Sequence, residues 1–555
     1  MRAYSAVGYP LLLVIVVTLI YGQFLGSPML FDDLGAFAVD ELGNQHIASY
    51  QFGWLEVRAL PMASLAWSVE VFGLNLRYLR VGNLLLHAAV AVALYIFLHQ
   101  LFAKVAQPFL TSEHLGARSV AFFAALIFAL HPIATYAAGY LVQRTILMST
   151  LFAILAMWSY VRGSLGGHRL WLWLTPVFYY FAVFSKEHAI VLPVVLLALT
   201  VLLHPNWLKK IKQCWAVFAV CFAIALLVLL LKKGLLGFVY EPNGSLMLDN
   251  MAATQTIAKS DTSGGESVYL LSGLTQSWLF FKYAALWLLP NPAWMSIDMR
   301  EAFSSGVVSR YLLALIGFMG WGIAALWMLF RRDKMGLFGF AMLFPWVMFL
   351  TEFSTVRIQE VFVLYRSYLW AIGACCILPV IISWIPARLA AVLLSAIALL
   401  LIPISMERLS TMSHPVLLWD DAEKLVRGRE DVPGVYRIYY NRGTELIKMG
   451  DHERGLADLQ KALVLAPELT SAYNNIGSAY LMKKEWGAAV EAFSQVIRIA
   501  KKRDDKLDFR PYAGRAMAYK ELGEMQKAMD DYLQGCKVDP AGCSHFKSFN
   551  DLHVN

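Results

Sequence analysis

The stretch LRVGNLLLHAAVAVALYIFLHQLF, residues 79–102, is apolar along almost its whole length. A helix of about 20 apolar residues crosses the hydrocarbon core of a bilayer, so this stretch is long enough to span a membrane. Arg80 is its one strongly charged side chain. The stretch therefore predicts a membrane-spanning helix.

The composition extends this prediction to most of the chain. Of the 555 residues, 59% are hydrophobic and 15% are charged, against about 25% charged residues in soluble domains. Apolar blocks fill residues 8–405, and a charged, Ala-rich segment follows from Met406. The net charge of +8 comes from short Lys and Arg clusters between the apolar blocks, which indicates membrane topology and not nucleic-acid binding. We expect a polytopic membrane protein with the lipid bilayer as a partner and no nucleic-acid partner.

About eleven membrane spans are predicted, each near the length of a bilayer-crossing helix. They cover residues 9–25, 79–102, 119–138, 143–161, 170–185, 188–203, 214–231, 311–330, 336–351, 368–385 and 388–405. The first block lacks the cleavage site of a signal peptide, so we expect a retained anchor. The apolar stretch Trp278–Leu289 is short for a span, and we interpret it as an interfacial or re-entrant helix.

Basic clusters predict which loops are cytoplasmic, because they fall in alternate short loops. These clusters are Lys104 with Arg118, Arg162 with Arg169, Lys209-Lys210-Lys212, Arg331-Arg332-Lys334, and Arg388. The N-terminus is then inside, and the segment after residue 405 is outside. If residues 278–289 cross the membrane, that segment becomes cytoplasmic instead. The large outer segments are residues 26–78, 232–310 and 352–367, where a site could be built.

The C-terminal segment shows the period of about 34 residues that is typical of tetratricopeptide repeats. The repeat positions are Gly443, Gly455, Leu459, Ala462 and Pro467; then Gly477, Tyr480, Ala489 and Phe493; then Ala516, Tyr519, Ala528, Tyr532 and Pro540. We predict a linker at 406–435, three repeats over 436–542 with an insertion at 501–507, and a tail at 543–555. Such solenoids mostly bind extended protein segments, and a structural cap on the membrane domain is the alternative.

The cysteines fall into two groups. Cys214, Cys221, Cys375 and Cys376 lie inside apolar blocks, where cysteine is usually a small packing residue. Cys536 and Cys543 lie in the terminal domain. These two form either a disulfide, if the domain faces an oxidising compartment, or two unpaired thiols.

An acidic pair, Asp32-Asp33, follows the first predicted span. Two carboxylates so close to apolar surface raise one another's pKa, and one of them could act as a general base or bind a divalent cation. A solvated helix cap is the alternative reading of this pair.

Further polar groups fall on the same predicted outer face. They are His131, which ends the third span; Tyr140, Gln143 and Arg144; Ser185-Lys186-Glu187-His188; and Arg357 to Glu360 with Tyr365 and Arg366. Each group alone could be an interface anchor with its charge in water. Together, cations that face two carboxylates suit a substrate with a phosphate group.

The order of these motifs resembles one family over nearly the whole chain. The motifs are Phe31-Asp32-Asp33, the stretch from Tyr78 to His87, His131-Pro132-Ile133 before Arg144, Ser185-Lys186-Glu187, Tyr365-Arg366-Ser367-Tyr368-Leu369, and the trailing repeats. The chain resembles the GT-C membrane glycosyltransferases with appended tetratricopeptide repeats, a group that includes transmembrane O-mannosyltransferases and their bacterial relatives. The implied fold is all-α, a polytopic membrane helical bundle of the GT-C type with a C-terminal α-solenoid.

The resemblance implies an inverting transfer of sugar from a polyprenyl-phosphate donor to a hydroxyl acceptor on the outer face. By this resemblance Asp32 and Asp33 are catalytic, and Asp32 is favoured as the base. The resemblance also implies that Arg144, Lys186 and Arg366 bind the lipid phosphate. The residues expected to position substrates are His131, Glu187, His188, Glu360 and Tyr365. A divalent cation, Mg or Mn, held by the two aspartates is an open alternative, because some members of the family bind one.

The predicted acceptor is a protein, such as a pilin-like substrate, recruited by the repeats. A lipid or polysaccharide acceptor is a second interpretation, and a membrane scaffold or transporter is a third that belongs to another class. The expected location is the bacterial inner membrane with the repeats in the periplasm. The alternative is the endoplasmic-reticulum membrane with the repeats in the lumen.

Overall fold

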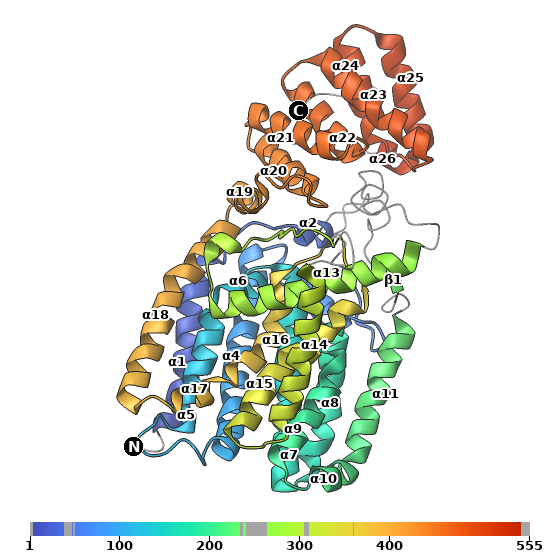
Figure 1. Ribbon diagram of the computed structural model, residues 1–555. Coiled ribbons are helices and arrows are strands. Elements are labelled where there is room, and N and C mark those ends of the chain that lie inside the picture. The colour runs from blue at the N-terminus through green and yellow to red at the C-terminus, as the bar shows by residue number, and fades with distance from the viewer. Residues whose placement is uncertain are drawn as a thin grey trace. The chain divides into compact units, whose positions relative to one another are not determined.

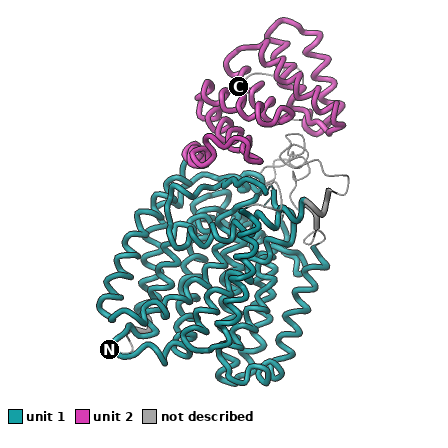
Figure 2. The backbone as a smooth tube through the Cα atoms, in the orientation of Figure 1, with its two compact units in different colours: residues 1–38, 45–414 teal, residues 39–44, 415–555 magenta. Residues whose placement is uncertain are grey.

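The computed structural model describes residues 4–37, 47, 50–232, 237–239, 264–304, 310–358 and 360–544. These residues are almost entirely helical, as predicted. They form two compact units (Figure 2), one that ends at His414 and one that begins at Pro415. The composition changes at Met406, but the last helix of the first unit continues to Met412, so the second unit begins several residues later than the composition suggests.

The first unit contains the following elements, where η marks a 3₁₀ helix. In chain order they are α1 (Tyr4–Tyr21), η1 (Gly22–Phe24), α2 (Asp32–Ala36), α3 (Ala59–Phe72), α4 (Leu76–Val105), α5 (Ala117–Leu130), α6 (Pro132–Ala138), η3 (Leu141–Gln143), α7 (Arg144–Gly166), α8 (Arg169–Ser185), η4 (Glu187–Val191), α9 (Leu192–Leu203), α10 (Trp207–Gln213), α11 (Trp215–Leu231), β1 (Gly237–Val239), α13 (Gly264–Leu288), η5 (Pro292–Trp294), α14 (Arg310–Leu329), α15 (Lys334–Phe349), η6 (Leu350–Phe353), β2 (Thr355–Val356), η7 (Leu364–Arg366), α16 (Ser367–Cys375), α17 (Leu378–Ile382) and α18 (Ala387–Met412).

The long helices of this unit run side by side in a bundle (Figure 1). The short helices α2 and α6 lie at the end of the bundle away from the N-terminus, and α10 lies at the end near it. Because α10 carries Lys209, Lys210 and Lys212, this basic cluster and the acidic pair at the start of α2 lie at opposite ends. That arrangement agrees with the predicted sidedness of the loops.

Six described helices are long and apolar enough to cross a membrane, and eight if two bent pairs each count as one span. These counts are lower than the prediction of about eleven spans. The difference comes from shorter apolar helices, such as Gly8–Phe24 and Glu187–Leu203, which have at most 17 residues each. Apolar side chains on the bundle surface, among them Leu313, Ile323 and Leu399, are more than half exposed, which is compatible with lipid contact.

Small residues let neighbouring helices of the bundle approach closely. A Cβ atom added at Gly163 of α7 would lie 2.7 Å from the backbone nitrogen of Leu172 in α8. A Cβ atom added at Gly339 of α15 would lie 2.5 Å from that of Leu329 in α14. Both distances are too short for a side chain, so glycine sets the helix spacing here, as is common in membrane bundles.

The predicted outer segments contain secondary structure of their own. Residues 26–78 include α3, and residues 232–310 include β1 and α13. The helix α13, which contains the stretch Trp278–Leu289 except for its last residue, runs across the bundle (Figure 1), as expected for an interfacial helix. Strand β1 pairs in parallel with β2, with Gly237 opposite Thr355 and Val239 opposite Val356.

The second unit is a series of helical hairpins. Its helices are α19 (Pro415–Val426), α20 (Tyr436–Lys448), α21 (His452–Leu465), α22 (Thr470–Met482), α23 (Trp486–Arg503), α24 (Arg510–Glu521), α25 (Met525–Val538) and α26 (Pro540–Ser544). The pairs α20 with α21, α22 with α23, and α24 with α25 are the three predicted repeats. The predicted insertion extends α23 and its loop, and the predicted linker contains the helix α19.

Phe493 of α23 joins the second and third repeats. Cβ atoms added at Gly477 of α22 and Gly514 of α24 would lie 2.7 Å and 2.4 Å from its ring. The two glycines therefore leave the space that the phenyl ring fills. This agrees with the predicted pattern, in which small residues let helices approach and large ones fill the gap between hairpins.

The two cysteines of the second unit form a disulfide bond, Cys536–Cys543, with their Cα atoms 4.9 Å apart. It links the end of α25 to α26. Of the two readings that the sequence allows, the structure has the disulfide. The other four cysteines are free.

Candidate functional site

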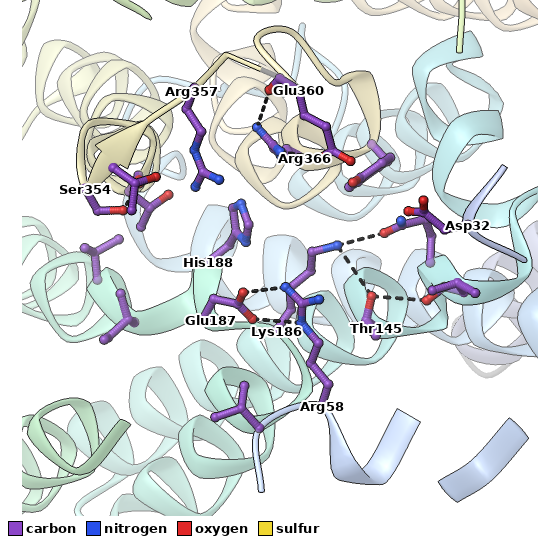
Figure 3. A pocket seen from close by; sticks show the side chains of 18 of the residues that line it. Asp32, Arg58, Thr145, Lys186, Glu187, His188, Ser354, Arg357, Glu360 and Arg366 are labelled. Carbon is purple, nitrogen blue, oxygen red and sulfur yellow. Dashed lines mark hydrogen bonds and ion pairs between the residues drawn. The ribbon is translucent and has the colours of Figure 1, made fainter. Parts of the chain in front are cut away.

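A cavity of about 970 Å³ lies in the first unit (Figure 3). Its lining includes Asp32, Arg58, Lys186, Glu187, Arg357 and Arg366. These residues come from α2, the loop before α3, the turn between α8 and η4, η4 itself, the loop after β2, and η7. The cavity has the size of pockets that enclose a small molecule or a cofactor.

The two aspartates of the acidic pair have different environments. Asp32 is exposed and lines the cavity, whereas Asp33 is fully buried. The carboxylate of Asp33 accepts hydrogen bonds from the backbone N–H groups of Val142, at 2.9 Å, and Leu30, at 3.3 Å. Burial raises the pKa of Asp33 to about 7, and the nearby Arg80 and these hydrogen bonds only partly oppose that shift.

The Asp33 contacts join the start of α2 to the loop before α7. The backbone N–H of Asp32 donates a 2.7 Å hydrogen bond to the hydroxyl of Tyr140 in the same loop. Phe31, just before the pair, has a φ of +51°, which is strained for an aromatic residue. The buried contacts of Asp33 thus hold a strained turn that presents Asp32 to the cavity.

Lys186 is a buried cation with neutral partners. Its ammonium donates to Gln143 Oε1 at 2.7 Å and to Thr145 Oγ1 at 3.4 Å, and it lies 4.5 Å from the centre of the Tyr365 ring. No carboxylate oxygen of the described residues lies within 4 Å of the Lys186 ammonium, since the nearby acids pair with other cations. Burial lowers the pKa of Lys186 to about 7, and the cations Arg58 and Arg366 add to this effect.

Glu187 is held by two cations from other parts of the chain. Arg58 donates to it through both Nε, at 3.1 Å, and a terminal nitrogen, while Lys232 Nζ lies 2.7 Å from its Oε1. Arg58 has a φ of +70°, so a second strained residue borders the cavity. Because Arg58 donates to the Glu187 carboxylate, its charge is compensated, unlike that of Lys186.

Glu352 is a buried carboxylate that gathers the remaining cationic groups. Its Oε2 accepts a 2.9 Å hydrogen bond from Arg366 and lies 3.6 Å from Arg357 Nε. Its Oε1 lies 3.2 Å from His188 Nε2. Arg366 also donates to Glu360 Oε2 at 2.7 Å, so its charge is balanced by two acids.

Most of the predicted site residues therefore meet in one place. The ones that line the cavity are Asp32, Lys186, Glu187, His188, Glu360, Tyr365 and Arg366. Asp33 lies behind Asp32, as described above. The structure thus brings together groups from segments that are up to 334 residues apart, Asp32 and Arg366 being the extremes.

Arg144 and His131 do not line the cavity. The buried Arg144 guanidinium donates to Asn83 Oδ1 at 2.9 Å and to the backbone oxygens of Leu79, at 2.8 Å, and Ser64, at 3.0 Å. These hydrogen bonds join α7 to α4 and α3, so the Arg144 guanidinium has a structural role and not the predicted contact with a phosphate. His131 caps α6 by accepting from the backbone N–H of Ile133, and its ring stacks on Trp287.

Three residues of the site were not predicted from the sequence. Arg58 lies in a segment without a recognisable motif. Glu352 directly follows the predicted span 336–351, and no motif there indicates a role in the site. Arg357 belongs to a polar group that the sequence singles out, but it had no role assigned. A charged residue directly after an apolar block, such as Glu352, is the signal that could have found one of them.

The two aspartates do not form a ready metal site. Both oxygens of Asp33 accept backbone N–H groups, which leaves Asp32 as the carboxylate of this pair that faces the cavity. Among the described residues, no group of three or more His, Cys, Asp or Glu side chains is placed to hold a metal ion. The alternative of an Mg or Mn ion held by both aspartates stays a prediction, with Asp32 as the carboxylate that could contact it from the cavity.

Comparison with known proteins identifies the C-terminal repeats. Residues 436–469 and 509–541 match the family model of the tetratricopeptide repeat. The chain is similar to the tetratricopeptide repeat domain-containing protein PYG7, chloroplastic, of Arabidopsis thaliana, with 31% identity over 80 residues, 13% of this chain and 27% of that protein. It is also similar to a lipoprotein NlpI homolog of Haemophilus influenzae, with 26% identity over 102 residues, 18% of this chain and 31% of that protein.

The chain covers only about a third or less of the length of these relatives, 27% and 31%. Such a match does not carry over an activity. The second unit consists of tetratricopeptide repeats, which generally bind proteins. The function of the first unit has to be inferred from its own cavity.

Proposed function

We propose that the protein is a membrane glycosyltransferase that moves a sugar from a polyprenyl-phosphate donor to a hydroxyl group of a protein acceptor. The observation that carries this proposal is that one cavity contains both the exposed Asp32 carboxylate and the buried Lys186 ammonium, and that no carboxylate of the described residues forms an ion pair with this ammonium. A buried cation is costly unless an anion compensates it. We infer that the substrate supplies that anion.

A phosphate group is the anion that fits best. Arg58, Arg357 and Arg366 surround the same space, but each already lies near a carboxylate. A phosphodiester at Lys186 would bring one negative charge to a cation that has only neutral partners among the described residues. Its arrival would also stabilise the charged form of Lys186.

Asp32 is then placed to act as the base. The acceptor oxygen forms a bond to the anomeric carbon of the sugar and gives its proton to the Asp32 carboxylate. The bond from that carbon to the phosphate oxygen breaks, and the electron pair leaves with the polyprenyl phosphate. Lys186 stabilises the negative charge that gathers on the departing phosphate.

The location of the chain's exit from the bundle supports a protein acceptor. Leu409 and Met412, at the end of α18, lie close to Gly139, in the loop region that holds Asp32. The last helix of the bundle therefore ends near the loop that holds Asp32. The disulfide of the repeats is typical of an oxidising compartment, which supports a periplasmic or luminal location of repeats and cavity, in a bundle of about eleven spans.

Replacing Asp32 by Asn tests the proposal. In a strain that lacks the gene, glycopeptide mass spectrometry of surface and secreted proteins should show a glycan that wild-type protein restores and the Asp32→Asn variant does not. A general base typically contributes about 10²- to 10⁴-fold to the rate. Binding of the polyprenyl-phosphate donor should stay within about twofold.

Asp333→Asn is a matched control for this test. Asp333 is exposed and caps α15 near the basic end of the bundle, and Asn caps helices as well as Asp does. This variant should restore the glycan fully. If the Asp32→Asn variant also restores it, the assigned chemistry is wrong. If the missing glycan lies in the lipid or polysaccharide fraction, the acceptor class is wrong.

A further inference from the structure

The cavity has a second polar region beyond the Asp32 and Lys186 pair. Here His188, Thr355 and Arg357 line it. In Figure 3, Arg357 and His188 point toward one another, on the far side of Lys186 from Asp32. His188 and Arg357 both approach Glu352, at 3.2 Å and 3.6 Å, which places them in one cluster.

This region holds hydrogen-bonding atoms without partners. His188 Nδ1, Thr355 Oγ1 and Arg357 Nε are buried, and none has a hydrogen-bond partner in the part of the chain that the structure describes. The three residues are 6%, 2% and 7% exposed. Buried polar atoms are nearly always satisfied in folded proteins, so three that line one cavity point to a ligand that satisfies them.

The charges here favour a neutral ligand. Glu352 compensates Arg357 and also Arg366, so this region does not share the unpaired charge of Lys186. The unsatisfied atoms of these residues comprise a guanidinium donor, a hydroxyl that can donate and accept, and both imidazole nitrogens of His188. Such a mixed set matches vicinal hydroxyl groups, which also donate and accept.

We propose that Thr355, His188 and Arg357 bind the hydroxyl groups of the transferred sugar and thereby determine which sugar the protein accepts. This inference rests on the proposed function, since it assigns the phosphate to Lys186 and the sugar ring to the adjoining region. Thr355 is buried, and its backbone pairs with Gly237 in the two-stranded sheet, which restricts its position. A rigid hydroxyl discriminates between sugar epimers better than a mobile one.

Thr355→Val is the variant that tests it, because valine has the shape of threonine without the hydroxyl. His188 and Arg357 are less suitable, since their loss would also disturb Glu352. Thr150→Val is a matched control. Thr150 Oγ1 is likewise buried without a hydrogen-bond partner, but Thr150 belongs to α7 and does not line the cavity. Thr355→Ser keeps the hydroxyl and should restore binding.

The experiment measures binding to the detergent-solubilised full chain. The probes are bare undecaprenyl phosphate and the same carrier linked to glucose, mannose or galactose. Wild-type protein should bind one hexose-linked carrier more tightly than the others. Thr355→Val should weaken that binding about tenfold, the typical effect of one lost hydrogen bond, and should change binding of the bare carrier less than about twofold.

The outcomes separate the two proposals. Equal weakening of bare and hexose-linked carriers by Thr355→Val, or no weakening of either, would overturn the sugar assignment while the phosphate site stands. The same holds if wild-type protein binds every hexose-linked carrier and the bare carrier equally well. If wild-type protein binds no carrier, or if Lys186→Met weakens none of them, the proposed function itself fails, and the sugar assignment fails with it.

Discussion

Lys186 of the cavity and the half-buried arginines of the repeats have opposite kinds of partner. In the third repeat, Arg515 donates to both oxygens of Asp531, each at 2.7 Å, and to Ser494 at 2.9 Å. Arg442 makes the same bidentate contact with Asp458 in the first repeat. In the cavity, Lys186 has an amide oxygen, a hydroxyl and an aromatic ring as partners.

This difference separates structural cations from a binding cation. A bidentate Arg–carboxylate pair is satisfied within the protein and leaves nothing for a ligand to add. The Lys186 ammonium is held in position by neutral groups, so it gains most when an anion arrives. The comparison therefore predicts that changes at Lys186 alter ligand binding, and changes at Arg515 alter the stability of the repeats.

The largest expected effect is on binding of the donor to Lys186→Met. This variant removes the charge and keeps the apolar stem, so affinity for a polyprenyl-phosphate-linked sugar should fall about 100-fold, the typical loss from one buried charged hydrogen bond. Thermal stability in detergent should stay the same or rise, because an uncompensated buried charge is lost. Titration of the solubilised chain with the donor measures the affinity, and a thermal melt in the same detergent measures the stability. Unchanged affinity would contradict the role of Lys186.

A smaller effect is expected from Arg515→Met in the repeats. Loss of the half-buried pair should destabilise α24 and α25 by about 2 kcal/mol, because Asp531 keeps a buried charge without its partner. Hydrogen–deuterium exchange of these helices in the full chain measures the change. The exposed Arg498 serves as the control in Arg498→Met. Donor affinity should not change in either variant, and a loss of it would break the separation between the two regions.

The smallest effect per step is the loss of donor affinity with each pH unit above 7. Because the pKa of Lys186 is lowered to about 7, the empty site loses its positive charge as the pH rises above 7. A phosphodiester keeps its single charge, so affinity should fall by up to about tenfold per pH unit above 7. In Lys186→Arg the guanidinium stays charged, and the affinity should be flat from pH 7 to 9. A wild-type profile as flat as that of the arginine variant would contradict the lowered pKa.

Much of the fold could be predicted because its signals are local. Apolar runs such as residues 79–102 need only their own composition to predict a helix, and the repeat positions around Gly477 and Phe493 need only their spacing. The span count was less predictable, because a stretch such as 188–203 is apolar but short. Its role depends on neighbours that the local sequence does not reveal.

The candidate site was predictable to the extent that its motifs lie next to spans. Asp32 and Lys186 could be chosen because each follows an apolar block. The sequence does not show that Asp33 is buried while Asp32 faces the cavity, because this difference depends on hydrogen bonds from the backbone N–H groups of Val142 and Leu30. Arg144 looked like a phosphate ligand in the sequence, but its partner Asn83 lies 61 residues away.

The ring of Phe493 has a mechanical consequence for the solenoid. The ring packs against both Gly477 and Gly514. The second and third hairpins therefore share one buried side chain, and separating them would expose that ring to water. A force applied along the solenoid should extend these two hairpins together in a single step. A peptide gripped by the repeats would then pull on a stiff two-hairpin block, which transmits tension without stretching.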